Sequence, residues 1–126
     1  MSRATILLVE DNADDEALAM EVLVSEGLRK QVRIARDGQE ALDFLFEDSL
    51  PCLPRIVLLD LKLPKVSGLD VLRSIKADPK TSVLPVVIFT SSRMERDRVD
   101  AYRLGANSYV HKPVEFARFT LAVKQV

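Results

Sequence analysis

Short apolar runs alternate with amphipathic stretches along the chain, and this alternation constrains the fold more than any other feature. Residues 6–9, 56–59 and 86–89 are continuously apolar, which is typical of strands buried on both faces of a parallel sheet. Two further runs are more polar, as expected for edge strands. We therefore predict five strands, at about residues 4–9, 31–35, 55–60, 84–90 and 107–111.

Polar pairs mark the starts of three helices between these strands. The first residue of each pair can accept a hydrogen bond from a backbone N–H, and an acidic residue follows three positions later. The pairs are Asp37 with Glu40, Ser67 with Asp70, and Ser92 with Glu95. They predict helices at about 37–46, 67–78 and 92–104, the last two ended by Asp78-Pro79 and by Gly105.

Apolar stripes at helical spacing predict a first and a last helix. The stripes consist of Ala17, Met20 and Val24 within residues 14–27, and of Phe116, Phe119 and Val123 in the final helix. Five strands alternating with five helices predict an α/β fold with a five-stranded parallel doubly wound sheet. With 126 residues, we expect one domain over residues 1–126 and no output domain.

Charge and composition exclude several classes of protein. The 18 basic and 19 acidic residues give a net charge of −1, which provides no field for attracting nucleic acid or an anionic membrane surface. No run reaches the length of a transmembrane helix and no signal-peptide pattern opens the chain, so we expect a cytoplasmic protein. Cys52 is the only cysteine, which rules out an intrachain disulfide.

Polar side chains follow four of the five predicted strands. In an open α/β sheet, ligands bind at the carboxyl ends of the strands, and here these ends carry Glu10, Asp11, Asp60, Thr90 and Lys112. Neighbouring carboxylates each disfavour ionisation of the other, so Glu10 and Asp11 suit a fold in which a cation lies beside them.

These residue types fit the transfer of a phosphoryl group to a carboxylate. An aspartate can act as the nucleophile and form an acyl phosphate. Mg²⁺ prefers hard oxygen ligands and keeps several of its waters, so a few carboxylates suffice to hold it. A lysine supplies a fixed positive charge and a hydroxyl bonds another phosphoryl oxygen, while positioning and electrostatics supply most of the catalysis.

The motifs at the strand ends resemble the signature of the receiver domain of two-component response regulators. They are Glu10-Asp11, the stretch from Asp60 through Pro64 to Gly68, Thr90-Ser91 and Lys112-Pro113, in that order. The resemblance implies a flavodoxin-like sheet with strand order 2-1-3-4-5. It also implies a phosphoprotein that takes its phosphoryl group from a sensor histidine kinase or a phosphotransfer protein. Such a phosphoacceptor takes part in its own phosphorylation and dephosphorylation, and is no turnover enzyme on other substrates.

The same resemblance assigns roles at the metal site. Asp60 would be the phosphoacceptor and would bind Mg²⁺ together with Asp11. The backbone carbonyl of Lys62 would be a further ligand, and Glu10 would act through water. The side chain of Lys62 has three open roles: pairing with the phosphoryl group, pairing with Glu10, or pointing to solvent.

A switch is also implied by the resemblance. Thr90 and Lys112 would contact the phosphoryl group, and Tyr109 matches the switch aromatic. If Thr90 moves toward the phosphoryl group, Tyr109 could rotate into the space behind it. The face formed by the helix at 92–104, the strand at 107–111 and the final helix would then change shape and signal to a downstream protein. The helix at 92–104 has few apolar residues, which suits a low local opening energy. His111 is assigned no role.

Other functions for this fold fit the sequence less well. A flavin or nucleotide binder needs a phosphate-cradling loop after the first strand, where this chain has acidic residues instead. The pattern of an aspartate-based phosphatase has a second aspartate two positions after the nucleophile, as a general acid. This chain has Lys62 at that position. A degenerate receiver that only binds partners would lack part of the set. The stretch from Asp60 to Lys65 is similar to small regulators paired with bacterial phytochrome kinases, some of which dimerise, so a bacteriophytochrome partner and a homodimer are both expectations.

Overall fold

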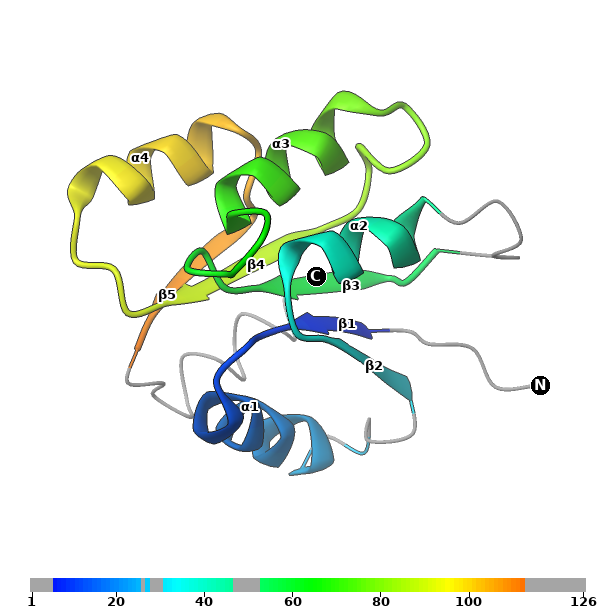
Figure 1. Cartoon of the computed structure of the whole chain (residues 1–126), viewed down its shortest axis with the longest axis vertical. Helices are drawn as coiled ribbons and strands as arrows, with labels where there is room; N and C mark the ends of the chain where they lie inside the picture. Colours follow the sequence, from blue (N-terminus) through cyan, green and yellow to red (C-terminus); the bar gives the residue numbers. More distant parts are fainter. Residues whose placement is uncertain (1–5, 26, 28–30, 47–52, 113–126) are drawn as a thin grey trace.

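The computed structural model describes residues 6–25, 27, 31–46 and 53–112 (Figure 1). Its strands are β1 (Ile6–Val9), β2 (Val32–Ala35), β3 (Ile56–Leu59), β4 (Val86–Thr90) and β5 (Ser108–His111). They form one parallel sheet in the order β2-β1-β3-β4-β5. This confirms the predicted fold class and strand order. The predicted final helix and Cys52 lie outside the described residues.

The described helices lie on both faces of this sheet. They are α1 (Ala13–Ser25), α2 (Gly38–Leu45), α3 (Gly68–Ala77) and α4 (Glu95–Arg103). Helix α1 lies on one face, and α2, α3 and α4 lie together on the other (Figure 1). None of these helices is long and apolar enough to cross a membrane.

Burial along the strands follows the predicted pattern. Every residue of β1, β3 and β4 is buried, whereas the edge strands β2 and β5 are partly exposed. Each fully buried aliphatic side chain contributes about 1.5–3 kcal/mol. The three central strands therefore form a rigid support for the residues at their carboxyl ends.

Two of the three predicted helix caps are confirmed, and the third is wrong. The side chains of Asp37 and Ser67 accept hydrogen bonds from the backbone N–H groups of Glu40 and Asp70, three positions later. Helix α4 instead begins after Met94, which makes no side-chain cap. The Ser92 hydroxyl accepts from the Met94 N–H at 3.3 Å and not from the Glu95 N–H, because the helix begins two residues further along than predicted.

The buried face of α1 also differs from the prediction. The predicted stripe of Ala17, Met20 and Val24 faces largely outward, and Val24 is 48% exposed. The helix instead buries Ala19, Val22 and Leu23 against the sheet. Apolar residues surround most of this helix, so two stripes satisfy the helical period. The way the helix packs on β1 and β2 decides between them.

This corrected face predicts unequal effects of two adjacent truncations. Leu23→Ala should lower the free energy of unfolding by about 2–5 kcal/mol because it opens a cavity in the core. Val24→Ala should change it by less than about 0.5 kcal/mol because the side chain is largely solvated. Urea unfolding of both variants measures the difference, and equal losses would contradict the packing described here.

Candidate functional site

The carboxyl ends of β1 and β3 bring two acidic residues side by side. Val9 pairs with Leu59 at the ends of the two strands. The backbone pairing continues one residue further, since the Asp60 N–H donates to the Val9 carbonyl at 3.1 Å and the Glu10 N–H donates to the Ala35 carbonyl at 3.0 Å. Glu10 and Asp60 are therefore fixed by the sheet itself.

Three carboxylates converge at this edge. Oxygen atoms of Glu10, Asp11 and Asp60 all lie within 4.8 Å of one another. Glu10 is fully buried and Asp60 is 4% exposed, whereas Asp11 is exposed. The structure thus brings together the acidic residues singled out from the sequence, in an arrangement that suits a hard divalent cation.

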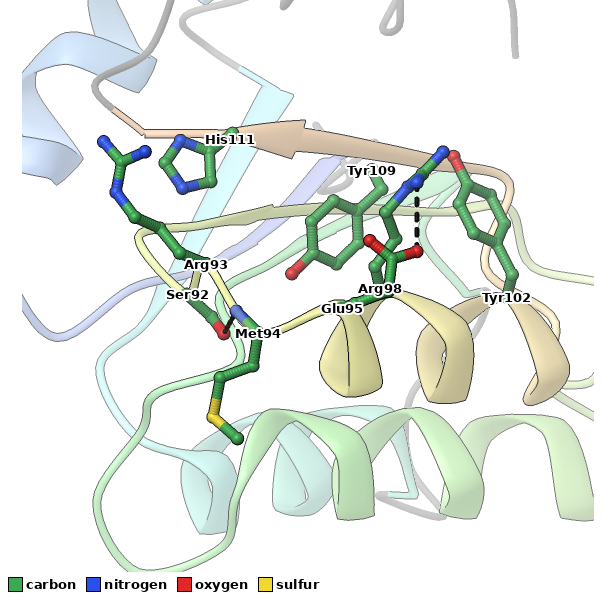
Figure 2. Close-up of a pocket in the computed structure, with 8 residues that line it drawn as sticks. All are labelled: Ser92, Arg93, Met94, Glu95, Arg98, Tyr102, Tyr109 and His111. Carbon is green, nitrogen blue, oxygen red and sulfur yellow. Dashed lines mark hydrogen bonds and ion pairs between the residues drawn. The ribbon is translucent and has the colours of Figure 1, made fainter.

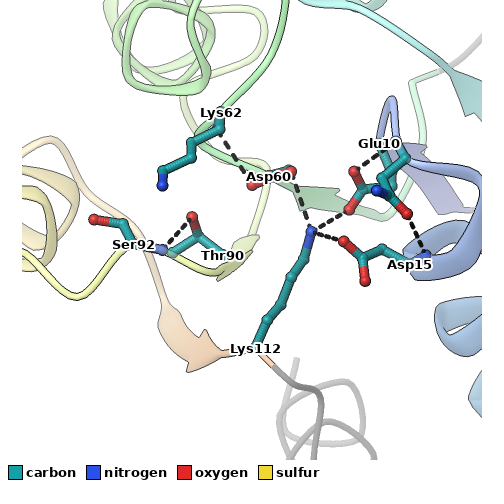
Figure 3. Close-up of polar contacts among 8 residues, drawn as sticks. Glu10, Asp15, Asp60, Lys62, Thr90, Ser92 and Lys112 are labelled. Carbon is teal, nitrogen blue, oxygen red and sulfur yellow. Dashed lines mark hydrogen bonds and ion pairs between the residues drawn. The ribbon is translucent and has the colours of Figure 1, made fainter.

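The ammonium group of Lys112 lies at the centre of the site (Figure 3). Its Nζ donates to Glu10 Oε1 at 2.6 Å, to Asp15 Oδ2 at 2.7 Å and to Asp60 Oδ2 at 3.2 Å. The backbone N–H of Lys112 donates to the Thr90 carbonyl at 2.7 Å. One buried ammonium group therefore donates to three carboxylates from different parts of the fold and partly neutralises their charge.

Asp15 is a site residue that the sequence analysis missed. It lies in the first turn of α1, where its N–H donates to Asn12 Oδ1 at 3.0 Å. That bond holds the turn so that the Asp15 carboxylate reaches Lys112. The first turn of α1 follows the acidic strand end directly and is itself acidic, with Asp14, Asp15 and Glu16, and these acidic residues were the available signal.

Burial and crowding change the acidity of this cluster. Burial, opposed by the hydrogen bonds from Lys112 and from the Asn12 N–H, raises the pKa of Glu10 from 4.5 to about 7. Burial lowers the pKa of Lys112, but its hydrogen bonds to Asp15 and Glu10 and the charge of Asp60 outweigh this, so that its pKa is raised overall. Lys112 therefore stays charged, whereas burial disfavours the ionised form of Glu10.

Thr90 presents a hydroxyl to the same edge. It is fully buried, and its Oγ1 accepts a hydrogen bond from the Ser92 N–H at 3.2 Å. That acceptor role leaves the proton of the Thr90 hydroxyl available for another oxygen. The Ser92 hydroxyl donates in turn to Asp97 Oδ2 at 2.5 Å, which links the site to the first turn of α4.

Tyr109 lies behind this link, in a pocket of about 400 Å³ between α4 and β5 (Figure 2). Its hydroxyl and His111 Nε2 are buried without hydrogen-bond partners in the described part of the chain. Burial, with the nearby charge of Asp97, raises the pKa of Tyr109. The ring lies 6.3 Å from that of Tyr102. The Ser92 hydroxyl is near enough to lower this pKa in part, so Tyr109 neighbours the residue that links Thr90 to α4.

The side chain of Lys62 is exposed and lies away from Glu10 (Figure 3). Its ammonium makes no ion pair with Glu10 or with any other described residue. Pairing with a phosphoryl group and pointing to solvent both remain as predicted roles. The Lys62 N–H, however, donates to Asp60 Oδ1 at 3.2 Å. The backbone at this position therefore orients the Asp60 carboxylate.

The raised pKa of Glu10 predicts a pH-dependent stability. The folded protein binds a proton at Glu10 more tightly than the unfolded chain, so ionisation of Glu10 opposes folding. In buffer without divalent cations, the wild type should lose stability relative to Glu10→Gln as the pH rises from about 4.5 to about 7. Urea unfolding across this range measures the difference, and a constant difference would show that Glu10 has an ordinary pKa.

Comparisons with known proteins agree with this geometry. The family described as the response regulator receiver domain matches residues 6–124. Response regulator Rcp1 from Synechocystis sp. is 41% identical over 112 residues, covering 85% of this chain and 75% of that protein. A solved structure of Rcp1 is of its Mn²⁺-bound form, with a TM-score of 0.82, 36% identity and coverage of 99% and 91% of the two chains.

Two further solved structures are of phytochrome-associated regulators. The bacteriophytochrome response regulator AtBRR is 46% identical with a TM-score of 0.81, covering 98% of this chain and 91% of that one. The phosphorylated cyanobacterial phytochrome response regulator RcpA is 36% identical with a TM-score of 0.82, covering 98% and 89%. The chain belongs to the response regulator receiver domain family.

Proposed function

We propose that residues 1–126 act as one phosphoacceptor domain, in which Asp60 takes a phosphoryl group from the phosphohistidine of a sensor histidine kinase with the help of Mg²⁺. One observation carries the proposal. Glu10, Asp11 and Asp60 converge within 4.8 Å at the carboxyl edge of the sheet, and the amine of Lys112 lies among them.

The available oxygen atoms support the predicted division of labour at the metal. Both oxygens of Glu10 are engaged, Oε1 by Lys112 and Oε2 by the Asn12 N–H at 3.0 Å. Asp11 is exposed and its carboxylate makes no hydrogen bond to any residue that the structure describes. Asp11 would therefore hold Mg²⁺ directly and Glu10 would act through water. Asp60 accepts from the Lys62 N–H and the Lys112 amine, so its direct role, like that of the Lys62 carbonyl, follows from the resemblance to receiver domains.

The protein's own residues would then position the transfer. Mg²⁺, when bound, supplies positive charge that neutralises oxygens of the incoming phosphoryl group. A carboxylate oxygen of Asp60 attacks phosphorus, the bond between phosphorus and the histidine nitrogen breaks, and the kinase imidazole leaves. Lys112 is already within hydrogen-bond distance of Asp60 Oδ2, and the Thr90 hydroxyl has a proton to donate to another phosphoryl oxygen.

The response to phosphorylation would pass through Thr90 and Tyr109 to α4. If Thr90 turns toward the phosphoryl group, Ser92 loses the acceptor of its N–H bond, and Tyr109 gains space to move inward. Helix α4 buries only Ala101, and Met94 and Tyr102 are 59% and 45% exposed. A helix with so few buried side chains needs little free energy to be displaced. A downstream protein would bind the altered surface.

The names of two relatives favour a particular kinase class. AtBRR and RcpA are described as phytochrome response regulators, and each covers almost the whole of this chain. A bacterial phytochrome kinase in the cytoplasm is accordingly the proposed phosphoryl donor.

Phosphorylation by a small donor tests the proposal. Incubation with acetyl phosphate and Mg²⁺ should add the mass of one phosphoryl group to the intact wild-type protein, and Asp60→Asn should abolish the addition. Asp70→Asn removes an exposed carboxylate on α3 and should have no effect. An unmodified wild type, or undiminished modification of Asp60→Asn, would refute the assignment of Asp60.

The two acidic residues that follow β1 should contribute unequally to metal binding. Asp11→Ala should weaken Mg²⁺ binding more than Glu10→Ala because only the Asp11 carboxylate is free to coordinate directly. Calorimetric titration with Mg²⁺ measures both losses, and Asp14→Ala, which removes an exposed acid nearby, serves as the control. Equal losses at residues 10 and 11 would overturn this division of roles.

A further inference from the structure

The loop between β3 and α3 carries both Asp60 and Lys62, and two glycines contact it: Gly68, where the loop ends, and Gly38 of α2. At one end the Gly68 N–H donates to the Leu61 carbonyl at 2.9 Å. A Cβ atom on Gly68 would overlap the Asp60 carbonyl oxygen. This contact closes the loop on its own beginning and belongs to the receiver motif already described.

The middle of the loop rests on a different element, at the first residue of α2. The Gly38 N–H donates to the Pro64 carbonyl at 3.3 Å, and the Val66 N–H donates to the same carbonyl at 2.8 Å. A Cβ atom on Gly38 would overlap the Val66 carbonyl oxygen and lie 2.7 Å from both the carbonyl carbon and the Cβ of Val66. These are backbone and near-backbone atoms, so a larger residue at 38 would force the loop and the helix apart.

Adjacent contacts reinforce this docking. Lys65 has a φ angle of +70°, the left-handed conformation that residues other than glycine rarely adopt. Its amine lies 3.6 Å from Asp37 Oδ2. Asp37 is also the N-cap of α2, accepting from the Glu40 N–H at 2.7 Å. The unusual backbone at Lys65 is thus matched to the start of α2.

Helix α2 is a fixed support for this loop because its inner face is buried. Ala41 and Leu45 are fully buried in the core, and Phe44 is 9% exposed. Lys62 lies between the two anchored parts of the loop, and its N–H orients Asp60. A displacement of Pro64 to Val66 would therefore move the Lys62 backbone and the N–H that orients Asp60, without replacing any residue of the site.

We infer that Gly38 is a positioning residue for the metal and phosphoacceptor site, because the contact of α2 with residues 64–66 sets where the Lys62 backbone lies. The inference rests on the proposed function in one respect, the use of the Lys62 carbonyl as a metal ligand. Residues that orient metal ligands typically contribute about 10–100-fold to metal affinity.

Gly38→Ala tests the inference by Mg²⁺ titration. Its dissociation constant for Mg²⁺ should rise by roughly tenfold, at the low end of that range. In phosphorylation by acetyl phosphate, the Mg²⁺ concentration for half-maximal rate should rise more than the rate at saturating Mg²⁺ falls. A purely structural effect would lower the melting temperature without shifting this Mg²⁺ dependence, provided that the assay temperature lies well below the unfolding transition.

Gly27→Ala is the matched control. Gly27 has a φ angle of +73°, and a Cβ atom there would meet nothing within 4 Å. This substitution should lower stability through backbone strain and leave the dissociation constant for Mg²⁺ unchanged. A similar rise in that constant for Gly27→Ala and Gly38→Ala would contradict the inference.

A gentler pair of variants keeps the inference testable if Gly38→Ala does not fold. Asp37→Ala removes the cap of α2 and the partner of Lys65, whereas Asp37→Asn retains a capping oxygen. Mg²⁺ affinity should fall for Asp37→Ala and stay close to wild type for Asp37→Asn. Equal affinities in both would overturn the inference while the wild type still binds Mg²⁺. A wild type that binds no Mg²⁺ would instead refute the proposed function.

Discussion

The three hydrogen bonds donated by the Lys112 amine are the interaction on which the rest of the structure depends. They join β5 to residues 102, 97 and 52 positions earlier in the chain, and so tie β1, α1 and β3 together. Removing one partner of a buried ion pair typically costs about 3–5 kcal/mol. The same bonds hold together carboxylates that would otherwise repel, so these ion pairs stabilise both the fold and the candidate site.

Much of this arrangement could be predicted from the sequence, because a parallel sheet brings the carboxyl ends of all its strands to one edge. The apolar runs therefore predict that Glu10, Asp11, Asp60 and Thr90 lie together at that edge. The sequence could not predict which of two equally suitable helix faces is buried, or which hydrogen bonds a polar side chain makes. Helix α1 has two apolar stripes of the same period, and only its packing against β1 and β2 selects one. Ser92 had a capping pattern, yet its hydroxyl bonds Asp97 within the loop and first turn of α4.

Two series of contacts extend from the site in opposite directions. One runs from Thr90 through Ser92 to Asp97, and it ends on a helix that buries a single residue. The other runs from Asp60 through the loop at 61–66 to Gly38, and it ends on a helix anchored in the core. The site is accordingly rigid where it would hold metal and compliant where it would transmit a change. This difference suits the proposed switch, because phosphorylation would displace the weakly anchored helix α4 and leave the support of the metal site in place.

A crystal structure of the protein with Mn²⁺ and beryllofluoride would test the account most directly. Mn²⁺ is located by its anomalous scattering, and beryllofluoride stands in for a phosphoryl group. We expect a Mn²⁺ peak bonded to Asp11, Asp60 and the Lys62 carbonyl, beryllofluoride on Asp60, and the Lys112 amine bonded to a fluorine. Mn²⁺ bound away from these residues, or an Asp60 carboxylate free of beryllofluoride, would contradict it.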